Sequence, residues 1–424
     1  MSATQPVKQL VDHLFRHESG KMIAVLSRLL GLQHLELAQD IVQDTLLQAM
    51  SSWSYGQVPD NPAGWLHKVA RNKAIDWLRR EKRFREISPD YARLVQSEWT
   101  LAPAMHQLFL EEEIGDSQLR MIFAACHPSI PEESQIAFTL KVLCGLSVSE
   151  IARAFLCPED TITKRIYRAR EKIRTEKIEL HVPQGEELAA RLDVVLKSLY
   201  LLFNEGYNSS QPDLLIREDL CEEAMRLCQL IAMHPLTRRP GVFALLSLFF
   251  FKASRLRTRL DDQGHIIILK YQDRKKWDRQ LIRKGFDQLE MAAEPFEVSA
   301  YHLEAAIASV HAAAPSFEET DWTSIYHLYE ILYQLQPNPV VALNKAIASA
   351  YAISRQHALA ELQKIKGLER HHLYFASLGE IHLEMNDHQK AKENFQQALM
   401  LTSSQQEKQL LEAKIARCLA IENN

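Results

Sequence analysis

The sequence predicts an all-α protein with more than one helical domain. Apolar residues recur at helical spacing along nearly the whole chain, and only residues 265–271, HIIILKY, have the composition of a strand. The chain has 424 residues, a length that indicates about two to four domains. We expect two small helical domains in the first 180 residues, followed by a larger helical domain.

The charge distribution argues against a protein that is basic throughout. The net charge is −4, and residues 1–180 carry 23 basic and 23 acidic side chains. Basic character is therefore confined to blocks within the sequence. The cysteines form no CxxC pair, which favours a reducing compartment and predicts neither a metal site nor another cofactor. They are Cys126, Cys144, Cys157, Cys221, Cys228 and Cys418.

The N-terminus and the longest apolar run argue against export and membrane insertion. Residues 1–15 lack a basic segment followed by an apolar core, as a signal peptide would have. The apolar run at residues 242–251 is interrupted by Ser247 and is too short to span a bilayer. We expect a cytoplasmic protein that does not bind a membrane.

Two amphipathic helical stretches are predicted within residues 8–53, separated near Gly31. The second, residues 35–53, has an apolar stripe on one side and an acidic, polar face on the other. Such a face is usually only solvated, but it could also dock on a basic partner. Its candidate partner-binding residues are Asp40, Gln43, Asp44 and Gln48.

The first basic block lies on a helix that Pro62 begins, after a loop at residues 54–61. Eight basic residues against two acids lie between Lys68 and Arg85, with aromatic residues among them. This composition is typical of single-strand binding, because bases stack on rings while cations hold phosphates. Trp77 is more simply a core residue, whereas Trp65 remains open. The candidate nucleic-acid residues are Trp65, Lys68, Arg71, Asn72, Arg79 and Arg80.

Residues 86–115 interrupt the helical periodicity and predict a linker. They contain two prolines and the acidic run Glu111–Glu113. Helices are expected at residues 116–125 and 131–144, and they lead into the second basic block.

Residues 145–177 predict a helix-turn-helix. Ser147 and Glu150 have the spacing of a capping box, and Pro158 opens the second helix. In that helix six basic residues stand against one acid between residues 161 and 174. The predicted buried stripe consists of Ile162, Ile166, Ala169 and Ile173. The alternative is a solvated amphipathic helix. The candidate DNA-reading residues are Thr161, Thr163, Lys164, Arg165, Tyr167 and Arg168.

The order of these elements resembles sigma factors of the sigma-70 class in their smallest form, the extracytoplasmic-function (ECF) group. Residues 38–45 are similar to the family helix that grips the RNA polymerase β′ clamp, and residues 61–80 to the helix that recognises the −10 element. Residues 146–152 and 161–170 are similar to the helix-turn-helix that recognises the −35 element.

The resemblance implies sigma region 2 at residues 8–86, a linker at 87–115 and sigma region 4 at 116–180. It implies core RNA polymerase, through its β′ clamp and β flap, and promoter DNA as partners. On the same resemblance, Glu111–Glu113 would run through the nucleic-acid channel of the polymerase. No catalytic residue is implied, and the protein is not expected to be an enzyme.

Residues 187–424 predict a further helical domain. Phe375, Leu378, Gly379, His382, Ala391, Phe395 and Ala398 have the spacing of a tetratricopeptide repeat, and such repeats are expected from about residue 302 to 405. Residues 199–207 and 217–220 resemble the signature of an ECF subgroup with a tetratricopeptide-like extension. Within this signature, a helix cap at Gly206 is favoured over a ligand site at Asn204 and Glu205. Cys221 and Cys228 are expected in the core.

The resemblance implies that this C-terminal domain regulates the protein, by contacting the polymerase or by masking region 2 or region 4. It leaves open whether the domain activates or inhibits, and whether it binds a regulatory protein or a ligand. The expected function is that of an alternative sigma factor. The alternative is a stand-alone helix-turn-helix regulator with a repeat-type sensor domain, which would have no use for residues 35–85.

Overall fold

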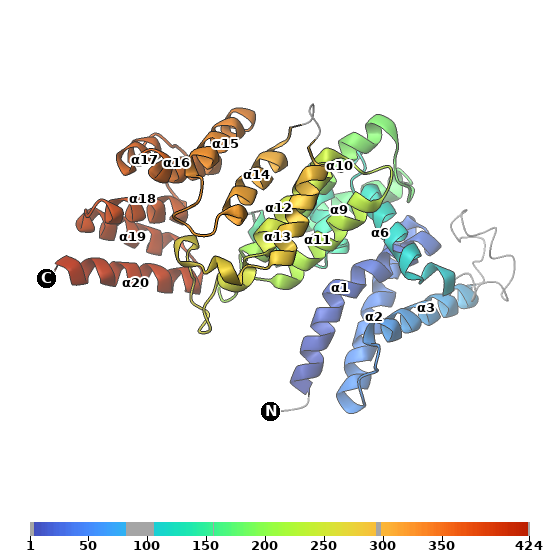
Figure 1. Ribbon diagram of the computed structural model, residues 1–424. Helices are drawn as coiled ribbons and strands as arrows, with labels where there is room; N and C mark the ends of the chain where they lie inside the picture. The colour runs from blue at the N-terminus through green and yellow to red at the C-terminus, as the bar shows by residue number, and fades with distance from the viewer. Residues whose placement is uncertain (1–3, 82–105, 156, 294–297, 423–424) are drawn as a thin grey trace. The chain divides into compact units, whose positions relative to one another are not determined.

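The computed structural model describes residues 4–81, 106–155, 157–293 and 298–422. In these ranges the chain is almost entirely α-helical, and the predicted all-α class is confirmed. The chain divides into two compact units. Unit 1 comprises Met1–Leu202 and Glu222–Thr237, and unit 2 comprises Phe203–Cys221 and Arg238–Asn424. Figure 1 follows the helices along the chain.

Unit 1 begins with three helices that pack on one another: α1 (Thr4–Leu30), α2 (Leu35–Tyr55) and α3 (Pro62–Glu81). The predicted apolar stripe of α2 is largely buried, including Ile41, Leu46 and Ala49. Gly31 separates α1 from the next turn with a φ of 88°, a conformation that favours glycine.

Within the described residues of unit 1, the next helices are α6 (Glu111–Ala125), α7 (Glu132–Val142), α8 (Val148–Ala154) and α9 (Glu159–Thr175). Helix α6 begins at Glu111, five residues before the predicted start at Asp116. Three glutamates in the first turn stabilise the positive end of the helix dipole, which explains the earlier start. Most of the predicted linker, residues 82–105, lies outside the described residues.

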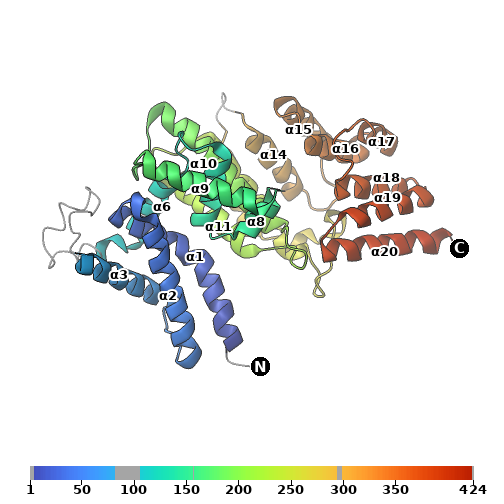
Figure 2. The same cartoon turned by 180° about the vertical axis from the view of Figure 1, so that it is seen from behind.

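Helices α8 and α9 form the predicted helix-turn-helix (Figure 2). The capping box is confirmed, because Ser147 Oγ accepts from the Glu150 amide at 3.2 Å and a Glu150 carboxylate oxygen accepts from the Ser147 amide at 2.6 Å. The predicted buried stripe of α9 is confirmed at all four positions. Pro158 directly precedes the first helical residue, Glu159.

Helix α10 (Gly185–Tyr207) and helix α11 (Glu218–Met233) lie mostly in unit 1. The guanidinium of Arg191 in α10 is 1% exposed and donates to the carbonyl oxygen of Phe123 in α6 at 3.1 Å. Arg191 also pairs with Glu187 one turn earlier. The helices after residue 180 therefore share a buried polar contact with the helix-turn-helix domain.

The predicted helix cap at Gly206 is wrong. Helix α10 continues to Tyr207, and a Cβ at Gly206 would lie 2.7 Å from the amide nitrogen of Cys221 and 2.9 Å from the carbonyl oxygen of Arg217. Glycine is needed for this close backbone approach. Cys221 and Cys228 are fully buried, as predicted.

Unit 2 is built around α12 (Pro240–Ala253), which is buried along almost its whole length. Helices α13 (Arg279–Met291) and α14 (Ala300–Ala313) pack against it. The strand-like residues 265–271 do not form a strand: Ile266 makes an isolated antiparallel bridge with Leu260, and Leu269–Tyr271 (η4) is a 3-10 turn. The remaining short elements are η3 (Leu256–Thr258) and η5 (Arg274–Lys276).

The end of unit 2 consists of helices joined by short loops, each packed on the next. These helices are α15 (Trp322–Leu335), α16 (Pro339–Ala352), α17 (Arg355–Leu362), α18 (His372–Glu384), α19 (His388–Leu401) and α20 (Gln405–Glu422). Between α18 and α19 a Cβ at Gly379 would lie 2.5 Å from the ring of Phe395, so the glycine lets the two helices approach closely. Among the described helices, none is both long enough and apolar enough to cross a bilayer.

Candidate nucleic-acid and polymerase interfaces

The predicted DNA-reading residues lie on the side of α9 that is opposite its buried stripe. Thr163, Lys164, Tyr167 and Arg168 are exposed, and Thr161 is partly exposed. Lys164 lies 3.2 Å from a carboxylate oxygen of Asp160, an exposed residue of the same helix. A surface pair of this kind contributes little and leaves the ammonium available to DNA.

Arg165 differs from its neighbours, because its guanidinium is held against the helix-turn-helix itself. It forms an ion pair with Glu133 of α7, and its Cζ lies 5.4 Å from the ring centroid of Phe155. Both contacts fix the orientation of α9 on the preceding helices. Sequence reasoning grouped Arg165 with the exposed cations because helical spacing does not show tertiary partners.

Arg170 is a residue of α9 that the candidate sites did not include. It donates to the side-chain oxygen of Gln39 in α2 at 2.8 Å and lies 3.6 Å from a carboxylate oxygen of Glu36. The C-terminal half of the basic helix thus faces the start of α2. This contact joins residues 131 positions apart, and local periodicity could not predict it.

The candidate single-strand residues lie on α3 with mixed exposure. Lys68, Asn72 and Arg79 are exposed, Trp65 and Arg71 are partly buried, and Arg80 is in the helix but its side chain is outside the described residues. The Trp65 ring packs edge-on against the buried ring of Trp53, with 5.3 Å between centroids. Trp65 is therefore fixed in place while keeping part of its surface in solvent.

Tyr55 is an aromatic residue beside this surface that sequence reasoning missed. It ends α2 at the start of the loop that leads to α3, and it is 94% exposed. A large aromatic ring left in solvent next to a basic helix can stack on a base. The sequence feature that could have identified Tyr55 is its position directly before Gly56, in the predicted loop at residues 54–61.

Beyond the contact of Arg170 with Glu36 and Gln39, the acidic, polar face of α2 is exposed. Asp40, Gln43, Asp44 and Gln48 are all exposed. Leu47, which was not predicted as part of this face, is 56% exposed among them. A single exposed leucine is common on protein surfaces, but this one lies among the candidate polymerase-binding residues.

Glu205, a possible ligand residue in the sequence, holds a loop in unit 2. Its carboxylate is buried and accepts from the Ser210 amide at 3.1 Å and from the Ser210 and Ser209 hydroxyls at 3.0 and 3.3 Å. Burial raises the pKa of Glu205, although these hydrogen bonds oppose the rise.

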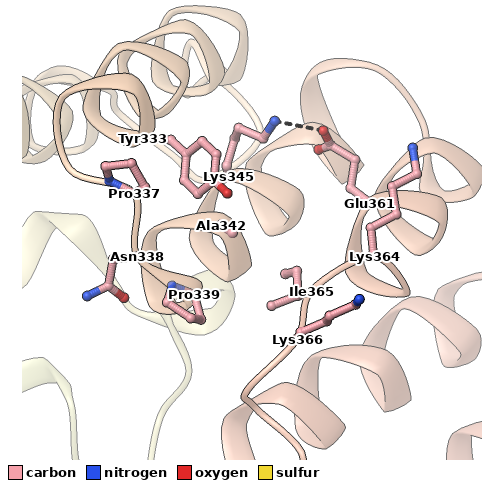
Figure 3. Close-up of a pocket in the computed structure, with 10 residues that line it drawn as sticks. All are labelled: Tyr333, Pro337, Asn338, Pro339, Ala342, Lys345, Glu361, Lys364, Ile365 and Lys366. Atoms are coloured by element: carbon pink, nitrogen blue, oxygen red, sulfur yellow. Dashed lines mark ion pairs between the residues drawn. The ribbon is translucent and has the colours of Figure 1, made fainter.

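Unit 2 also contains an open cavity of about 400 Å³ beside α16 and the end of α17 (Figure 3). Lys345 and Glu361 form an ion pair of 2.8 Å in its wall. Lys364 and Lys366, also in the wall, are exposed. Its remaining lining residues are Tyr333, Pro337, Asn338, Pro339, Ala342 and Ile365. The cavity thus offers mainly apolar surface and cations.

Three family models match successive parts of the chain. Sigma-70 region 2 matches residues 14–84, and sigma-70 region 4 matches residues 120–173. A family of unknown function (DUF6596) matches residues 191–293. The first two matches contain α2, α3, α8 and all but the last two residues of α9, and these helices carry the surfaces described above.

Several curated proteins are similar to this chain. It is 33% identical over 378 residues to an uncharacterized protein, R00370, of Rhizobium meliloti, with 88% of each chain covered. It is 32% identical over 135 residues to the ECF RNA polymerase sigma-E factor of Escherichia coli, covering 32% of this chain and 70% of that protein. It is 30% identical over 165 residues to the ECF RNA polymerase sigma factor SigE of Mycolicibacterium smegmatis, covering 38% and 60%.

No solved structure matches the chain significantly. The two sigma-70 matches occur in the order and at the positions of the helices that carry the basic and acidic surfaces. The similarity to the Escherichia coli sigma-E factor extends over 135 residues and covers 70% of that protein, and the third family match accounts for residues 191–293, beyond both sigma-70 matches. The chain therefore belongs to the ECF group of the sigma-70 family of RNA polymerase sigma factors and carries a C-terminal extension.

Proposed function

We propose that this protein is an alternative sigma factor whose C-terminal helical domain regulates its activity. Membership of the family gives the general role, transcription initiation with core RNA polymerase and promoter DNA. Sigma factors are initiation factors rather than enzymes. The observation that carries the proposal is that one chain combines two exposed basic helices, α3 and α9, with the open acidic face of α2.

Helix α9 would read the −35 element. Lys164 and Arg168 can bind phosphates or guanine edges in the major groove, and Thr161 and Thr163 can contact base edges or a thymine methyl group. Tyr167, 63% exposed, would add a contact to the backbone. Arg165 would act mainly by orienting the helix, because its guanidinium is already paired with Glu133.

Helix α3 and the loop before it would hold the opened −10 element. Extruding a base costs a few kcal/mol of stacking, which contacts to the captured base must offset. Trp65 and Tyr55 offer ring surfaces, and Asn72 offers hydrogen-bonding groups. The cations Lys68, Arg71, Arg79 and Arg80 would hold the backbone.

The polymerase would bind mainly through α2. Asp40, Gln43, Asp44 and Gln48 would face the β′ clamp, and Leu47 would supply the apolar centre that such interfaces have. Region 4, proposed at residues 116–180, would contact the β flap. These partners would place the protein in the cytoplasm.

Residues 187–424 would form the regulatory domain, with tetratricopeptide-like repeats over about 302–405. The close contact of Gly379 with Phe395 supports this repeat assignment, because paired repeat helices need small residues where they cross. A regulatory protein or a ligand could bind beside Lys364 and Lys366, at the cavity of Figure 3.

The experiment that tests the proposal is run-off transcription with the full chain, core RNA polymerase and a library of promoter fragments. We expect the protein to co-purify with core enzyme and to produce transcripts from a defined subset. The alternative, a stand-alone helix-turn-helix regulator, predicts duplex DNA binding without core polymerase binding. Failure to bind core enzyme while binding DNA would thus replace the sigma proposal with this alternative.

A further inference from the structure

We infer that unit 1 is a closed, inactive arrangement of the two sigma regions, and that α11 of the C-terminal extension clasps it shut. The inactivity rests on the proposed function, because it matters only if regions 2 and 4 bind separate promoter elements. Every contact that carries the inference lies within unit 1. The family match to region 2 contains most of α1, the match to region 4 contains α7, and α11 lies in the extension.

Gly20 of α1 packs tightly against the backbone of Leu143, which lies in the region 4 match. A Cβ at this position would lie 2.2 Å from the carbonyl oxygen of Leu143, which follows α7, and 3.0 Å from its carbonyl carbon. Real side chains do not reach such distances from backbone atoms. The closed arrangement therefore requires glycine at position 20, while neither region needs it for its own helices.

An ionic contact reinforces this packing on the neighbouring part of α1. Arg28, 12% exposed, lies 2.9 Å from a carboxylate oxygen of Glu113 and 2.8 Å from one of Asp116, both in α6. It also donates to the Ser117 hydroxyl at 3.2 Å. Because a largely buried guanidinium is costly to leave unpaired, separating Arg28 from these acceptors would be strongly unfavourable.

Helix α11 contacts α1 and α6 through one ion pair. Glu223, 4% exposed, accepts two hydrogen bonds from Arg226 and lies 3.9 Å from His17 of α1. Arg226 also donates to the side-chain oxygen of Gln118 in α6 at 3.1 Å. The extension thus places a buried charged pair, Glu223 and Arg226, where α1 meets α6. We call this pair the clasp.

The closed unit cannot occupy both promoter elements at once. The −10 and −35 elements are about 25 base pairs apart, which is about 85 Å of B-form DNA. A compact unit of about 220 residues, the size of unit 1, has a radius of gyration of about 17 Å and hence a diameter of about 45 Å. The regions must separate, and separation breaks the contacts of Gly20, Arg28 and Arg170.

The test forces the regions apart with Gly20→Val in the full chain. Spin labels at Ser51→Cys in α2 and Arg174→Cys in α9 report the distance between the regions by pulsed electron paramagnetic resonance. Both positions are exposed, and Cys157→Ser removes the one native cysteine that is not buried. The matched control is Gly379→Val, which makes a similar clash, 2.5 Å from Phe395, inside unit 2.

We expect one short distance in the parent and longer, broader distances in Gly20→Val, with none of this change in Gly379→Val. Apparent affinity for core polymerase should rise about tenfold or more, because an open state that is populated at 10% or less becomes the main one. An unchanged distance in folded Gly20→Val would overturn the closed arrangement. Longer distances with unchanged or weaker polymerase binding would overturn its inhibitory role.

A second pair of variants covers the case in which Gly20→Val does not fold. Glu223→Gln weakens the clasp without steric strain, and Lys197→Gln, at an exposed ion pair of α10, is its control. Glu223→Gln should lengthen the label distance, and the control should not; equal distances would contradict the clasp. If no variant binds core polymerase, the proposed function fails, while the distances still decide whether unit 1 is closed.

Discussion

The guanidinium of Arg170 in α9 donates a hydrogen bond to the side-chain oxygen of Gln39 in α2 at 2.8 Å. This contact joins the proposed DNA-reading helix to the proposed polymerase-binding helix. As long as it forms, the side-chain oxygen of Gln39 and one amino group of Arg170 are paired with each other. The contact therefore couples the two binding surfaces of the molecule.

Arg170→Ala is expected to raise the apparent affinity for core polymerase. A hydrogen bond to a charged group contributes about 1.5 kcal/mol or more, but Arg170 is partly exposed, so a two- to fivefold increase, about 0.5–1 kcal/mol, is the expected scale. Titration of labelled protein with core enzyme measures the change. Arg174→Ala is the control, since within the part of the chain that the structure describes Arg174 pairs with Glu171 of its own helix, at 3.0 Å. Equal effects of the two variants would remove any role for the contact with α2.

Reversing charge at Lys164 and Arg168 is expected to abolish binding to −35 element DNA. Each lost phosphate contact lowers the slope of log affinity against log salt by about 0.9 for duplex DNA, and reversal adds repulsion. Core polymerase affinity should not change, because both residues are exposed on α9, outside the packing with other helices. DNA binding at several salt concentrations gives the slope.

The matched control for this variant is the double reversal of Lys364 and Lys366 in unit 2. It makes the same change in net charge at exposed lysines beside the cavity. Its DNA affinity should stay near that of the parent protein. Loss of core polymerase binding in the α9 variant would mean that the two faces of region 4 have been assigned wrongly.

Arg191→Ala is expected to destabilise unit 1 by about 2–4 kcal/mol. The variant loses the hydrogen bond to Phe123 and removes a guanidinium that is 1% exposed, and it leaves a cavity between α10 and α6. Urea unfolding followed by the fluorescence of the Trp53 and Trp65 region reports on unit 1. Lys197→Ala on the same helix should cost about 0–1 kcal/mol, because its pair with Glu132 is exposed. Similar losses for the two variants would show that α10 does not stabilise unit 1 through Arg191.

The sequence predicted those features that depend on local order. The isoleucine stripe of α9 and the capping box of Ser147 with Glu150 follow from spacing within one or two turns, and both formed as predicted. The cap at Gly206 failed because a glycine that ends a helix and a glycine that allows close packing look alike in a sequence. The predicted start of α6 at Asp116 is five residues late, because the acidic run Glu111–Glu113 is compatible both with a linker and with a helix N-terminus.

The contacts between helices were beyond sequence reasoning. Arg170 with Gln39, and Gly20 with Leu143, join residues more than 100 positions apart, and periodicity shows which side of a helix is buried but not which helix covers it. Arg165 was expected to be free for DNA for the same reason, although Glu133 holds it.

Unit 2 is expected to lose stability as the pH falls below about 6.5, and His311 is one cause. Its ring packs edge-on against Trp322, with 5.2 Å between centroids, and its buried Nδ1 has no hydrogen-bond partner among the described residues. Burial, together with the positive charges of Arg255 and Arg274, lowers the pKa of His311 to about 3. Arg274 is held nearby by hydrogen bonds to the carbonyl oxygens of His311 and Ala314.

The sign follows from the protons bound. Between about pH 6.5 and 3 the imidazole of His311 is protonated in the unfolded chain but not in the folded chain, so acid favours unfolding. Between pH 6.5 and 5 the free energy of unfolding should fall by about 1–2 kcal/mol. His311→Phe keeps a ring against Trp322 and cannot bind a proton, so its urea midpoint should fall less between pH 7 and 5 than that of the parent. His327→Phe, at a side chain that is 64% exposed, should leave the pH dependence as it was. If His311→Phe retains the full acid sensitivity, other groups of unit 2 must cause it.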